Sequence, residues 1–332
     1  MVMIYTNYGS KFEQVHQESI LCSAEKAGVI FPYSCRNGRC SSCKCKILSG
    51  ETECLGEELG LTEYQKSQGW ILSCVRSAKE DLELEVEDLG GLPIIKPKTL
   101  PCKIDCITRI SNVIIRVVIR LPPSSKIEYY AGQYVEIIMG AIRRSYSIAN
   151  APATDNRIEL HIKKVDQGAM SQYWFHKAKE NDVLRVNGPL GTFFLRDVVG
   201  KNLIFLATGT GIAPVKSILE ELNRKPTHEH PDSVTVYWGG RTPSDFYWDL
   251  SQCEYPVRYE PVLSRPFAGW TGCVGYVQDV FLGTSPNLAK AVVYACGSDE
   301  MIRSASDLLI HHGLAEDMFY SDAFIASGVI YV

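Results

Sequence analysis

The sequence predicts a multidomain protein that combines α+β and α/β parts. The chain has 332 residues, which is too long for one ordinary core and suits two or three domains. A cysteine-rich stretch comes first, a β-branched stretch follows, and the last third alternates buried-type strands with helical segments. We therefore expect domains at residues 1–92, 102–198 and 199–332, with a linker at 93–101.

Composition and charge exclude several classes of partner. There are 34 Lys and Arg residues against 38 Asp and Glu, so no basic excess is available to bind nucleic acid or an anionic membrane surface. The first ten residues lack the layout of a secretory signal, and no apolar run approaches the ~20 residues that span a bilayer. We expect a cytoplasmic protein, in which clustered cysteines bind metal more often than they form disulfides.

The first stretch ends in a strand-like segment at 81–88, where apolar and acidic residues alternate. A run rich in glycine and proline follows, and this composition suits a short, fairly stiff linker. In the middle stretch, short β-branched segments between turn residues predict an antiparallel β-barrel or sandwich. These segments are 113–119, 134–139, 158–162 and 183–186.

The last stretch has the alternation that is typical of a parallel α/β sheet. Its buried-type strands are expected at 203–207, 234–238 and 291–295. Helical segments are expected between and after them, at 215–223 and 300–311.

Four cysteines carry the strongest signal in the chain. Cys35, Cys40 and Cys43 follow the spacing Cys-x4-Cys-x2-Cys, and Cys74 comes after thirty more residues. This is the ligand spacing of a plant-type 2Fe-2S cluster. Gly38 allows the loop to turn, so that backbone amides can point at the sulfurs. Zinc or buried structural cysteines are the alternatives, but zinc sites usually pair two Cys-x2-Cys knuckles and a second one is missing.

The run Arg144-Ser145-Tyr146-Ser147 follows the expected strand at 134–139. Its chemistry suits a flavin, because Arg144 offers a guanidinium for the pyrophosphate and Tyr146 offers a ring for the isoalloxazine. Ser147 would place a hydroxyl near the atom that accepts hydride, so we expect a catalytic role for it as well as binding.

A second segment, 158–164, leads to a turn formed by Gly168, Met170 and Ser171. There a glycine and a hydroxyl would begin a helix whose amides can hold phosphate. A plain strand followed by a capped helix is the alternative, but the neighbouring flavin-type run favours phosphate binding. His161 and Lys163 on the strand are candidate cofactor-binding residues, although a single histidine in a strand is more often packed or at the surface.

A glycine loop follows the strand at 203–207 and leads into a helix, where a dinucleotide pyrophosphate would meet the helix N-terminus. The candidate residues are Gly209, Thr210, Gly211 and Pro214. Proline stands where the dinucleotide fingerprint has its third glycine, so this loop alone is weak support. The pair Cys296-Gly297 repeats the strand-to-glycine geometry and would turn a thiol into the same cleft; an inert core cysteine is the alternative.

Taken together, these residues resemble the ferredoxin-NADP reductase superfamily, specifically the reductases with an N-terminal plant-type ferredoxin domain. The resemblance covers nearly the whole chain. Further segments are similar to the CDP-6-deoxy-delta-3,4-glucoseen reductases, namely 121–123, 131–134, 143–152, 188–194, 213–217, 312–316 and 319–324. The resemblance implies a β-grasp ferredoxin domain, an antiparallel β-barrel FAD domain and a parallel-sheet nicotinamide-binding domain.

The resemblance also implies residue roles. FAD is expected on Arg144, Tyr146, Ser147 and the turn at 168–171. The nicotinamide is expected near Thr210, Cys296 and Phe324, so the last two join Ser147 as candidate catalytic residues.

Two features depart from the family pattern. Ser264-Arg265 resembles the adenosine 2'-phosphate site of NADPH-using relatives, but Val274 stands where a lysine is expected nine residues after Arg265. We therefore expect NADH without excluding NADPH. Residues 325–332 extend beyond the pattern.

The expected activity is hydride transfer from the nicotinamide to flavin N5, followed by release of single electrons through the cluster. The resemblance implies a pyridoxamine-phosphate-dependent dehydratase as acceptor, acting on a CDP-linked 4-keto-6-deoxy sugar in 3,6-dideoxyhexose biosynthesis. Reductase components of multicomponent oxygenases share every motif above, so an oxygenase is the alternative acceptor. A redox sensor or electron-storage protein without turnover is a third, non-enzymatic alternative.

Overall fold

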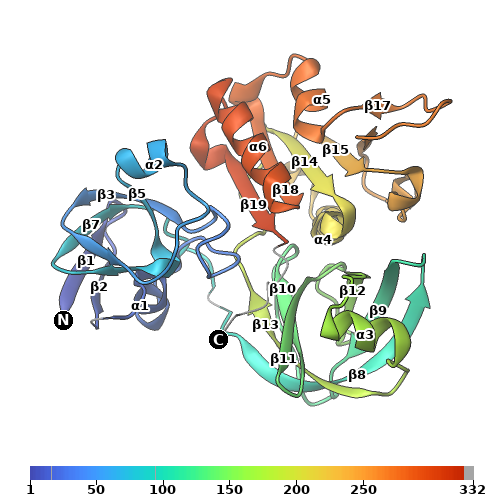
Figure 1. The fold of residues 1–332 in the computed structure, drawn as a ribbon, viewed down its shortest axis with the longest axis horizontal. Helices are drawn as coiled ribbons and strands as arrows, with labels where there is room; N and C mark the ends of the chain where they lie inside the picture. The colour runs from blue at the N-terminus through green and yellow to red at the C-terminus, as the bar shows by residue number, and fades with distance from the viewer. Residues whose placement is uncertain (16, 94, 325–332) are drawn as a thin grey trace. The chain divides into compact units, whose positions relative to one another are not determined.

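The structure is a computed structural model that describes residues 1–332 except 16, 94 and 325–332. The chain divides into a smaller unit, Met1–Ile94 with Ser321–Val332, and a larger unit, Ile95–Tyr320. Figure 1 shows both as ribbons. None of the helices in the described part of the chain has the length and apolar character that crossing a membrane requires.

The smaller unit is built on a five-stranded mixed sheet with the order β2-β1-β7-β3-β5. Its strands are β1 (Val2–Thr6), β2 (Lys11–Gln14), β3 (Lys44–Ser49), β5 (Trp70–Leu72) and β7 (Leu82–Glu85). Only the β1–β7 pair is parallel among the pairs described, and β4 (Thr52–Cys54) pairs separately with β6 (Arg76–Ala78). The first and last main strands therefore lie side by side at the middle of the sheet, which confirms the predicted β-grasp fold.

Helix α1 (Ile20–Lys26) packs its apolar residues against this sheet. Ser19 caps the helix by accepting a hydrogen bond from the Cys22 amide, which satisfies one of the free donors at the N-terminus. The unit also contains α2 (Glu63–Ser67) and the short 3-10 helix η1 (Ser73–Val75). Burial of large apolar side chains such as Phe31 and Leu72 provides the core on which the cysteine loop rests.

The first part of the larger unit is an antiparallel six-stranded sheet with the order β11-β10-β13-β8-β9-β12. The strands are β8 (Lys98–Arg109), β9 (Ile114–Arg120), β10 (Tyr134–Met139), β11 (Ile142–Ser147), β12 (Arg157–Lys163) and β13 (Val183–Leu190). A bridge between Ile148 and Leu160 joins the end of β11 to β12, which brings the two edges of the sheet together. The predicted antiparallel barrel is confirmed, with α3 (Ala169–His176) beside it.

The second part is a six-stranded sheet with the order β17-β16-β15-β14-β18-β19. The strands are β14 (Asn202–Thr208), β15 (Ser233–Gly240), β16 (Arg258–Leu263), β17 (Cys273–Val274), β18 (Ala291–Gly297) and β19 (Phe319–Ala323). From Ser321 on, the residues of β19 are assigned to the smaller unit. The pairs from β17 to β18 are all parallel. Strands buried on both faces read as continuous apolar runs, which is why β14 and β18 were predictable.

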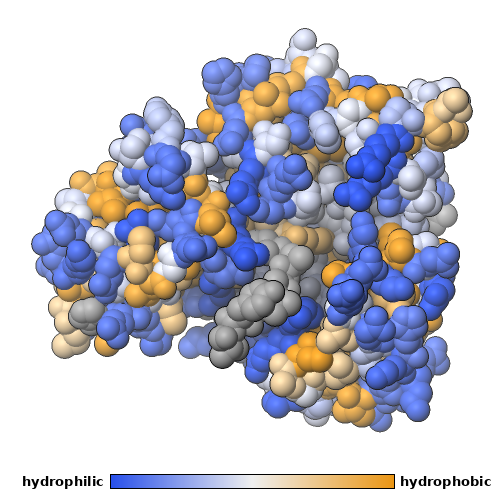
Figure 2. Space-filling view, in the orientation of Figure 1, coloured by the Kyte–Doolittle hydropathy of each residue, from blue (hydrophilic) through white to orange (hydrophobic). Residues whose placement is uncertain are grey.

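Three helices accompany this sheet, α4 (Ile212–Leu222), α5 (Val277–Gly283) and α6 (Asp299–His311). The 3-10 helices are η2 (Gly209–Gly211), η3 (Thr227–Glu229), η4 (Pro243–Asp245), η5 (Leu250–Gln252), η6 (Leu288–Lys290) and η7 (Glu316–Met318). The predicted parallel α/β domain is confirmed. On the face drawn in Figure 2, hydrophilic residues are interspersed with small hydrophobic areas.

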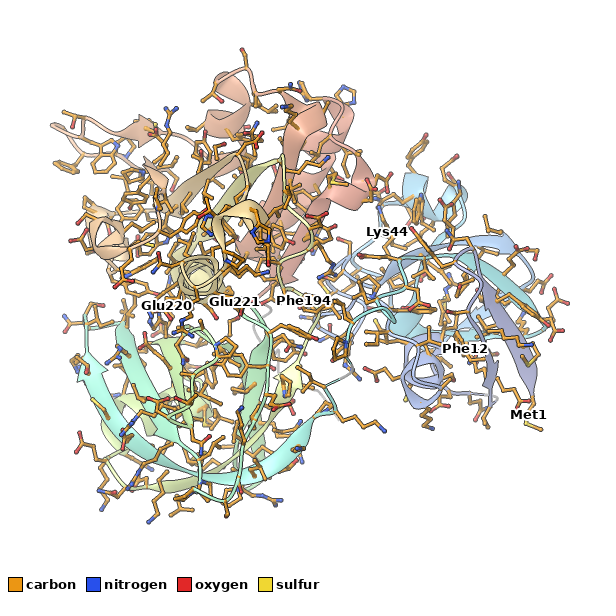
Figure 3. The ribbon with its side chains drawn as sticks, turned by 180° about the vertical axis from the view of Figure 1, so that it is seen from behind. Met1, Phe12, Lys44, Phe194, Glu220 and Glu221 are labelled. Atoms are coloured by element: carbon orange, nitrogen blue, oxygen red, sulfur yellow. The ribbon has the colours of Figure 1, made fainter. Side chains whose placement is uncertain are left out.

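Helix α4 lies between the parallel sheet and the barrel (Figure 1). Ser217 Oγ donates a hydrogen bond to the Asn150 carbonyl oxygen at 2.7 Å, and Lys216 Nζ donates to the Ala149 carbonyl oxygen at 3.0 Å. The amide of Ala151 donates to Glu220, which Figure 3 labels on α4 above the barrel strands. These bonds hold the barrel segment that follows β11 against the helix that follows the glycine loop.

Candidate cofactor sites

The four predicted cluster ligands form two pairs of thiols. Cys43 Sγ and Cys74 Sγ lie 3.2 Å apart. The Cys35 amide donates to Cys40 Sγ at 3.4 Å, and the Cys40 amide donates to Cys35 Sγ at 3.3 Å. Cys40, Cys43 and Cys74 are buried, and the loop and η1 bring them together across the spacing seen in the sequence. Two pairs match what two tetrahedral iron atoms need from a protein.

Backbone amides converge on the sulfurs of this loop. The pKa of Cys35 is lowered to about 6, first by the hydrogen bond from the Cys40 thiol and then by the amides of Asn37, Cys40 and Arg39, against the opposing effect of burial. The amide of Gly38 points toward Cys74. Such donors stabilise thiolates, which are the form that binds metal.

Gly38 is the residue that permits this loop conformation. It has a φ of +75°, and a Cβ atom there would lie 2.0 Å from the Glu57 carbonyl oxygen. Within the described residues, no three His, Cys, Asp or Glu side chains are grouped as a single metal ion requires. The two thiol pairs, Cys35 with Cys40 and Cys43 with Cys74, fit the thiolate ligand set of a cluster of two irons.

The two flavin-type segments meet at the barrel. Tyr146 on β11 accepts a hydrogen bond from Trp174 Nε1 on α3 at 3.0 Å, and burial raises the pKa of Tyr146 to about 12. Ser147 is buried at the end of β11, whereas Arg144 is half-buried and donates to the Arg143 carbonyl oxygen at 2.6 Å. A neutral phenol, a buried hydroxyl and a guanidinium on one strand fit a flavin.

The turn before α3 has the predicted layout. Gly168 is the N-cap and supplies no side-chain cap, which leaves the first amides of α3 available for phosphate. Ser171 Oγ accepts a hydrogen bond from the Val165 amide at 2.9 Å, so this hydroxyl stabilises the turn. Met170 is buried in the barrel core. Of the three residues, the glycine and the serine shape the backbone, and the methionine anchors it.

The glycine loop of the parallel sheet forms η2 and runs into α4. Gly209 has a φ of +55°, and its carbonyl oxygen accepts a hydrogen bond from Trp238 Nε1 at 3.0 Å. Thr210 and Pro214 are buried, and α4 has no side-chain cap at its N-terminus. Uncapped amides at the start of a helix, next to glycines that allow close approach, fit a dinucleotide pyrophosphate.

Cys296 lies beside this loop. Its thiol is fully buried and donates a hydrogen bond to the Gly211 carbonyl oxygen at 2.9 Å. The following residue, Gly297, has a φ of +133°, and a Cβ atom there would lie 2.2 Å from Thr208 Oγ1. The structure therefore brings both glycine motifs of the parallel sheet together.

Lys163 extends from β12 of the barrel toward the same loop. Its Nζ would lie 3.7 Å from a Cβ atom on Gly209. Lys163, which was predicted among the flavin-binding residues, therefore lies next to the glycine loop predicted to bind the dinucleotide. The sequence did not indicate that these two regions are close. Phe324 is half-buried and follows the end of β19.

His161 belongs to a buried polar cluster that the sequence did not reveal. Its Nε2 lies 2.9 Å from Glu159 Oε1, and its Nδ1 lies 2.9 Å from Tyr247 Oη. Glu159 also accepts from Arg116 at 2.6 Å and pairs with Lys216 at 3.3 Å. We name these five residues the Glu159 cluster. Because Lys216 and Tyr247 come from the α/β part, the cluster joins that part to the barrel.

Charges in the Glu159 cluster are mutually compensated. Burial would raise the pKa of Glu159, but hydrogen bonds from His161 and Arg116 and the charge of Lys216 outweigh it and hold that pKa well below its usual range. Burial lowers the pKa of His161, with Glu159 opposing it. The ring is therefore neutral near pH 7. A glutamate on a strand with apolar neighbours was the available signal in the sequence.

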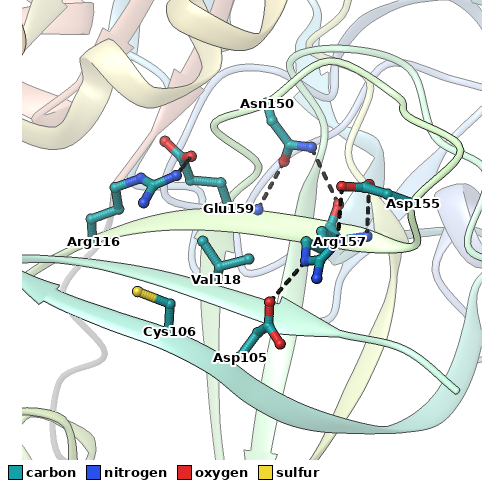
Figure 4. A pocket seen from close by; sticks show the side chains of 8 residues that line it. All are labelled: Asp105, Cys106, Arg116, Val118, Asn150, Asp155, Arg157 and Glu159. Carbon is teal, nitrogen blue, oxygen red and sulfur yellow. Dashed lines mark hydrogen bonds and ion pairs between the residues drawn. The ribbon is translucent and has the colours of Figure 1, made fainter. Parts of the chain in front are cut away.

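A cavity of about 350 Å³ opens on the barrel next to this cluster (Figure 4). It is lined by Asp105, Cys106, Arg116, Val118, Asn150, Asp155, Arg157 and Glu159. Arg157 pairs with Asp105 at 2.8 Å and with Asp155 at 3.4 Å. The charges of Arg157 and of the two aspartates are therefore already paired. The lining residues also do not include the predicted cofactor-binding side chains, so we assign no cofactor to this cavity.

Comparison with protein families assigns each part of the chain. Residues 6–79 match the 2Fe-2S iron-sulfur cluster binding domain. Residues 101–195 match the oxidoreductase FAD-binding domain, and residues 205–307 match the oxidoreductase NAD-binding domain. The predicted cofactors, a 2Fe-2S cluster, FAD and a nicotinamide dinucleotide, are confirmed.

Curated relatives match over nearly the whole chain. The chain is 43% identical over 313 residues to the CDP-6-deoxy-L-threo-D-glycero-4-hexulose-3-dehydrase reductase of Yersinia pestis, covering 93% of this chain and 94% of that protein. It is 29% identical over 330 residues to the xylene/toluene monooxygenase electron transfer component XylA of Pseudomonas putida, covering 95% and 91%.

Solved structures share the fold. The Amycolatopsis cytochrome P450 reductase GcoB is similar with a TM-score of 0.73 and 26% identity, over 98% of this chain and 99% of that one. The ferredoxin reductase in carbazole 1,9a-dioxygenase has a TM-score of 0.70 at 23% identity, over 98% of each chain. The chain therefore belongs to the ferredoxin-NADP reductase superfamily, among the members with an N-terminal plant-type 2Fe-2S domain, and is an NAD(P)H-dependent oxidoreductase that uses FAD and this cluster.

Proposed function

We propose that the protein is the NADH-dependent reductase of a pyridoxamine-phosphate-dependent CDP-4-keto-6-deoxyglucose 3-dehydratase in 3,6-dideoxyhexose biosynthesis. One observation carries the proposal. The identity to a protein named as a hexulose-3-dehydrase reductase is 43% over almost both full lengths, whereas the monooxygenase electron transfer component shares 29%. A shared partner is the simplest reason for the larger likeness.

Residue roles follow the predicted sets. Cys35, Cys40, Cys43 and Cys74 hold the cluster; Arg144, Tyr146, Ser147, His161, Lys163, Gly168, Met170 and Ser171 form the flavin side; and Gly209, Thr210, Gly211, Pro214, Cys296 and Gly297 form the nicotinamide side. Ser147, Cys296 and Phe324 orient the reacting rings. Bound FAD supplies two-electron acceptance, and the bound cluster supplies one-electron transfer.

The protein's own contribution is orientation and exclusion of water. The buried hydroxyl of Ser147 and the buried thiol of Cys296 are groups that can hold a ring in place without taking part in acid-base chemistry. The Glu159 cluster supports this by fixing the barrel against α4, and Lys163 supplies positive charge between the two phosphate-binding segments.

Three further assignments belong to the proposal. The domains are 1–92, 102–198 and 199–332 with a linker at 93–101; the family matches lie within these ranges except at residue 101, and β8 begins at Lys98 within the linker. NADH is the donor, because Val274 is 57% exposed where an NADPH-using relative would have a lysine. The compartment is the cytoplasm.

Reconstitution tests the proposed acceptor. The purified holoprotein with NADH should support loss of the C3 hydroxyl from CDP-4-keto-6-deoxyglucose when a pyridoxamine-phosphate-dependent 3-dehydratase is added. Product is followed by chromatography and mass spectrometry, and the Cys40→Ser variant is the matched control. No product with an active dehydratase would overturn the sugar-pathway role.

The second candidate acceptor is a hydroxylase of a multicomponent oxygenase. The match to the xylene/toluene component over 95% of this chain favours it. Hydroxylated product with an iron hydroxylase, together with failure on the dehydratase, would select this alternative. Steady NADH oxidation with an artificial acceptor would exclude an electron-storage role.

A further inference from the structure

Ser321 and Asp322, the residues of β19 that belong to the smaller unit, contact the cysteine loop at two points. Ser34 Oγ donates a hydrogen bond to Asp322 Oδ1 at 2.7 Å. Ser42 Oγ donates to the Ser321 carbonyl oxygen at 3.0 Å and lies 3.3 Å from Ser321 Oγ. All of these residues belong to the same compact unit.

Each contact lies one residue from a cluster ligand. Ser34 precedes Cys35, which belongs to the first thiol pair, and Ser42 precedes Cys43, which belongs to the second. Two neighbouring residues of β19 therefore hold both halves of the loop. These contacts help to fix the positions of the three thiols of the loop, because residues 34–43 themselves form no helix or strand.

Asp322 is a buried carboxylate in this arrangement. Asp322 and Ser34 are each 4% exposed. Salt and water screen a buried charge much less than a surface charge. Reduction of the cluster adds one negative charge, so a nearby buried carboxylate opposes it and lowers the reduction potential.

We propose that Asp322 is a positioning residue for the cluster, which orders the cysteine loop through Ser34 and keeps the reduction potential of the cluster low. The inference rests on the proposed cluster ligands. Asp322 lies outside the ferredoxin-type residues 1–92, and the proposal gives it a role in setting the potential at which the cluster releases electrons.

Asp322→Asn in the full-length holoprotein separates charge from shape. The amide oxygen can still accept the Ser34 hydrogen bond, but the negative charge is gone. The midpoint potential of the cluster, followed by electron paramagnetic resonance of the reduced state, should shift upward. The flavin potential, followed by absorbance, and the iron content should stay at the values of the unsubstituted protein.

Asp317→Asn is the matched control, because it removes the same charge from an exposed position five residues earlier. Its cluster potential should not change. An Asp322→Asn shift that is absent, or equal to that of Asp317→Asn, would overturn the proposal. A wild-type protein without a cluster signal would instead refute the ligand assignment on which it rests.

Ser34→Ala gives an independent reading if Asp322→Asn does not fold. It leaves the carboxylate without this donor, so its charge is less compensated and the cluster potential should shift downward. Ser34→Thr, which keeps the hydroxyl, should restore the wild-type potential. A loop that is merely loosened would not produce shifts of opposite sign in the two variants, so an unchanged or raised potential in Ser34→Ala contradicts the inference.

Discussion

The Cys296 thiol and the Gly211 carbonyl oxygen lie 2.9 Å apart and form a hydrogen bond. Cys296 lies near the end of β18, and Gly211 follows the neighbouring strand β14. Their backbones pack closely, since a Cβ atom on Gly211 would lie 2.3 Å from the Cys296 carbonyl oxygen. This contact joins the loop that we expect to bind pyrophosphate to the thiol that we expect beside the nicotinamide.

Gly211→Ala should therefore impair use of NADH. The added methyl group meets backbone atoms that cannot rotate away, and such overpacking typically costs about 1–3 kcal/mol. Because the loop must shift away from its binding geometry, we expect KM for NADH to rise in reduction of a two-electron dye, and each 1.4 kcal/mol lost from binding would raise it about tenfold.

Gly283→Ala is the matched control for this substitution. Gly283 ends α5, has no positive φ, and a Cβ atom there would meet nothing within 4 Å. KM should stay unchanged, and stability should rise slightly because alanine is the better helix former. Equal effects of the two alanines on KM would show that the glycine loop does not contact the dinucleotide.

Cys40→Ser should separate the two kinds of electron acceptor. NADH-driven reduction of a two-electron dye needs only the flavin and should persist, whereas reduction of a one-electron protein acceptor needs the cluster and should fall to background. A direct ligand should matter more than the ~10–100-fold typical of outer-shell residues at metal sites. Iron analysis and parallel assays with both acceptors give the measurement.

Cys54→Ser provides the comparison, because Cys54 is an exposed cysteine of the same unit outside the four-cysteine set. It should keep both activities and the full iron content. Equal loss of both activities in Cys40→Ser would count against electron flow from flavin to cluster.

Arg144→Ala should release the flavin. A guanidinium that bonds to a pyrophosphate contributes about 1.5–3 kcal/mol, which corresponds to roughly 10–100-fold in affinity. The FAD content after dialysis and the Kd for added FAD report this loss. Arg143→Ala is the neighbouring control, since Arg143 is exposed and lies 3.7 Å from Glu136. If the Arg143 variant lost as much FAD, general damage to β11 would be the better explanation.

Local sequence patterns were sufficient for several strands and helices and for the main motifs, whereas the β-grasp fold was predicted from the family resemblance. The continuous apolar run of β14 is visible in adjacent residues, as is the alternation of apolar and acidic residues at 81–88, which contains β7. The helix expected at 300–311 is observed as Asp299–His311. The cysteine spacing likewise predicted four thiols that the structure pairs. These features depend on short-range periodicity or on a ligand spacing with few alternatives.

The remaining features depend on contacts between distant residues. Tyr247 lies 86 positions from His161, and Asp322 lies 288 positions from Ser34. Neither separation has a periodicity that a single sequence displays. A histidine in a strand was therefore ambiguous, and only the folded chain shows that its ring is bonded on both sides.

The Glu159 cluster predicts how stability depends on pH. Burial lowers the pKa of His161 in the folded protein, whereas an unfolded histidine titrates at about 6.5. Unfolding therefore takes up a proton at lower pH, so this contribution is complete above about pH 6.5 and is lost as the pH falls. Glu159, whose pKa is also lowered, acts in the same direction but only as the pH falls below about 4.3.

His161→Gln should remove the loss of stability that His161 causes as the pH falls below about 6.5. Glutamine can still bond to Glu159 and Tyr247 but does not take up a proton, so Tm should fall less between pH 7 and pH 5 than in the unsubstituted protein. One proton contributes at most about 1.4 kcal/mol per pH unit. His228→Gln is the control, because its side chain is 81% exposed and its replacement should leave the slope of Tm against pH unchanged. A His161→Gln protein with the full wild-type slope would mean that other groups carry the pH dependence, since the buried ring is the only difference between the two proteins.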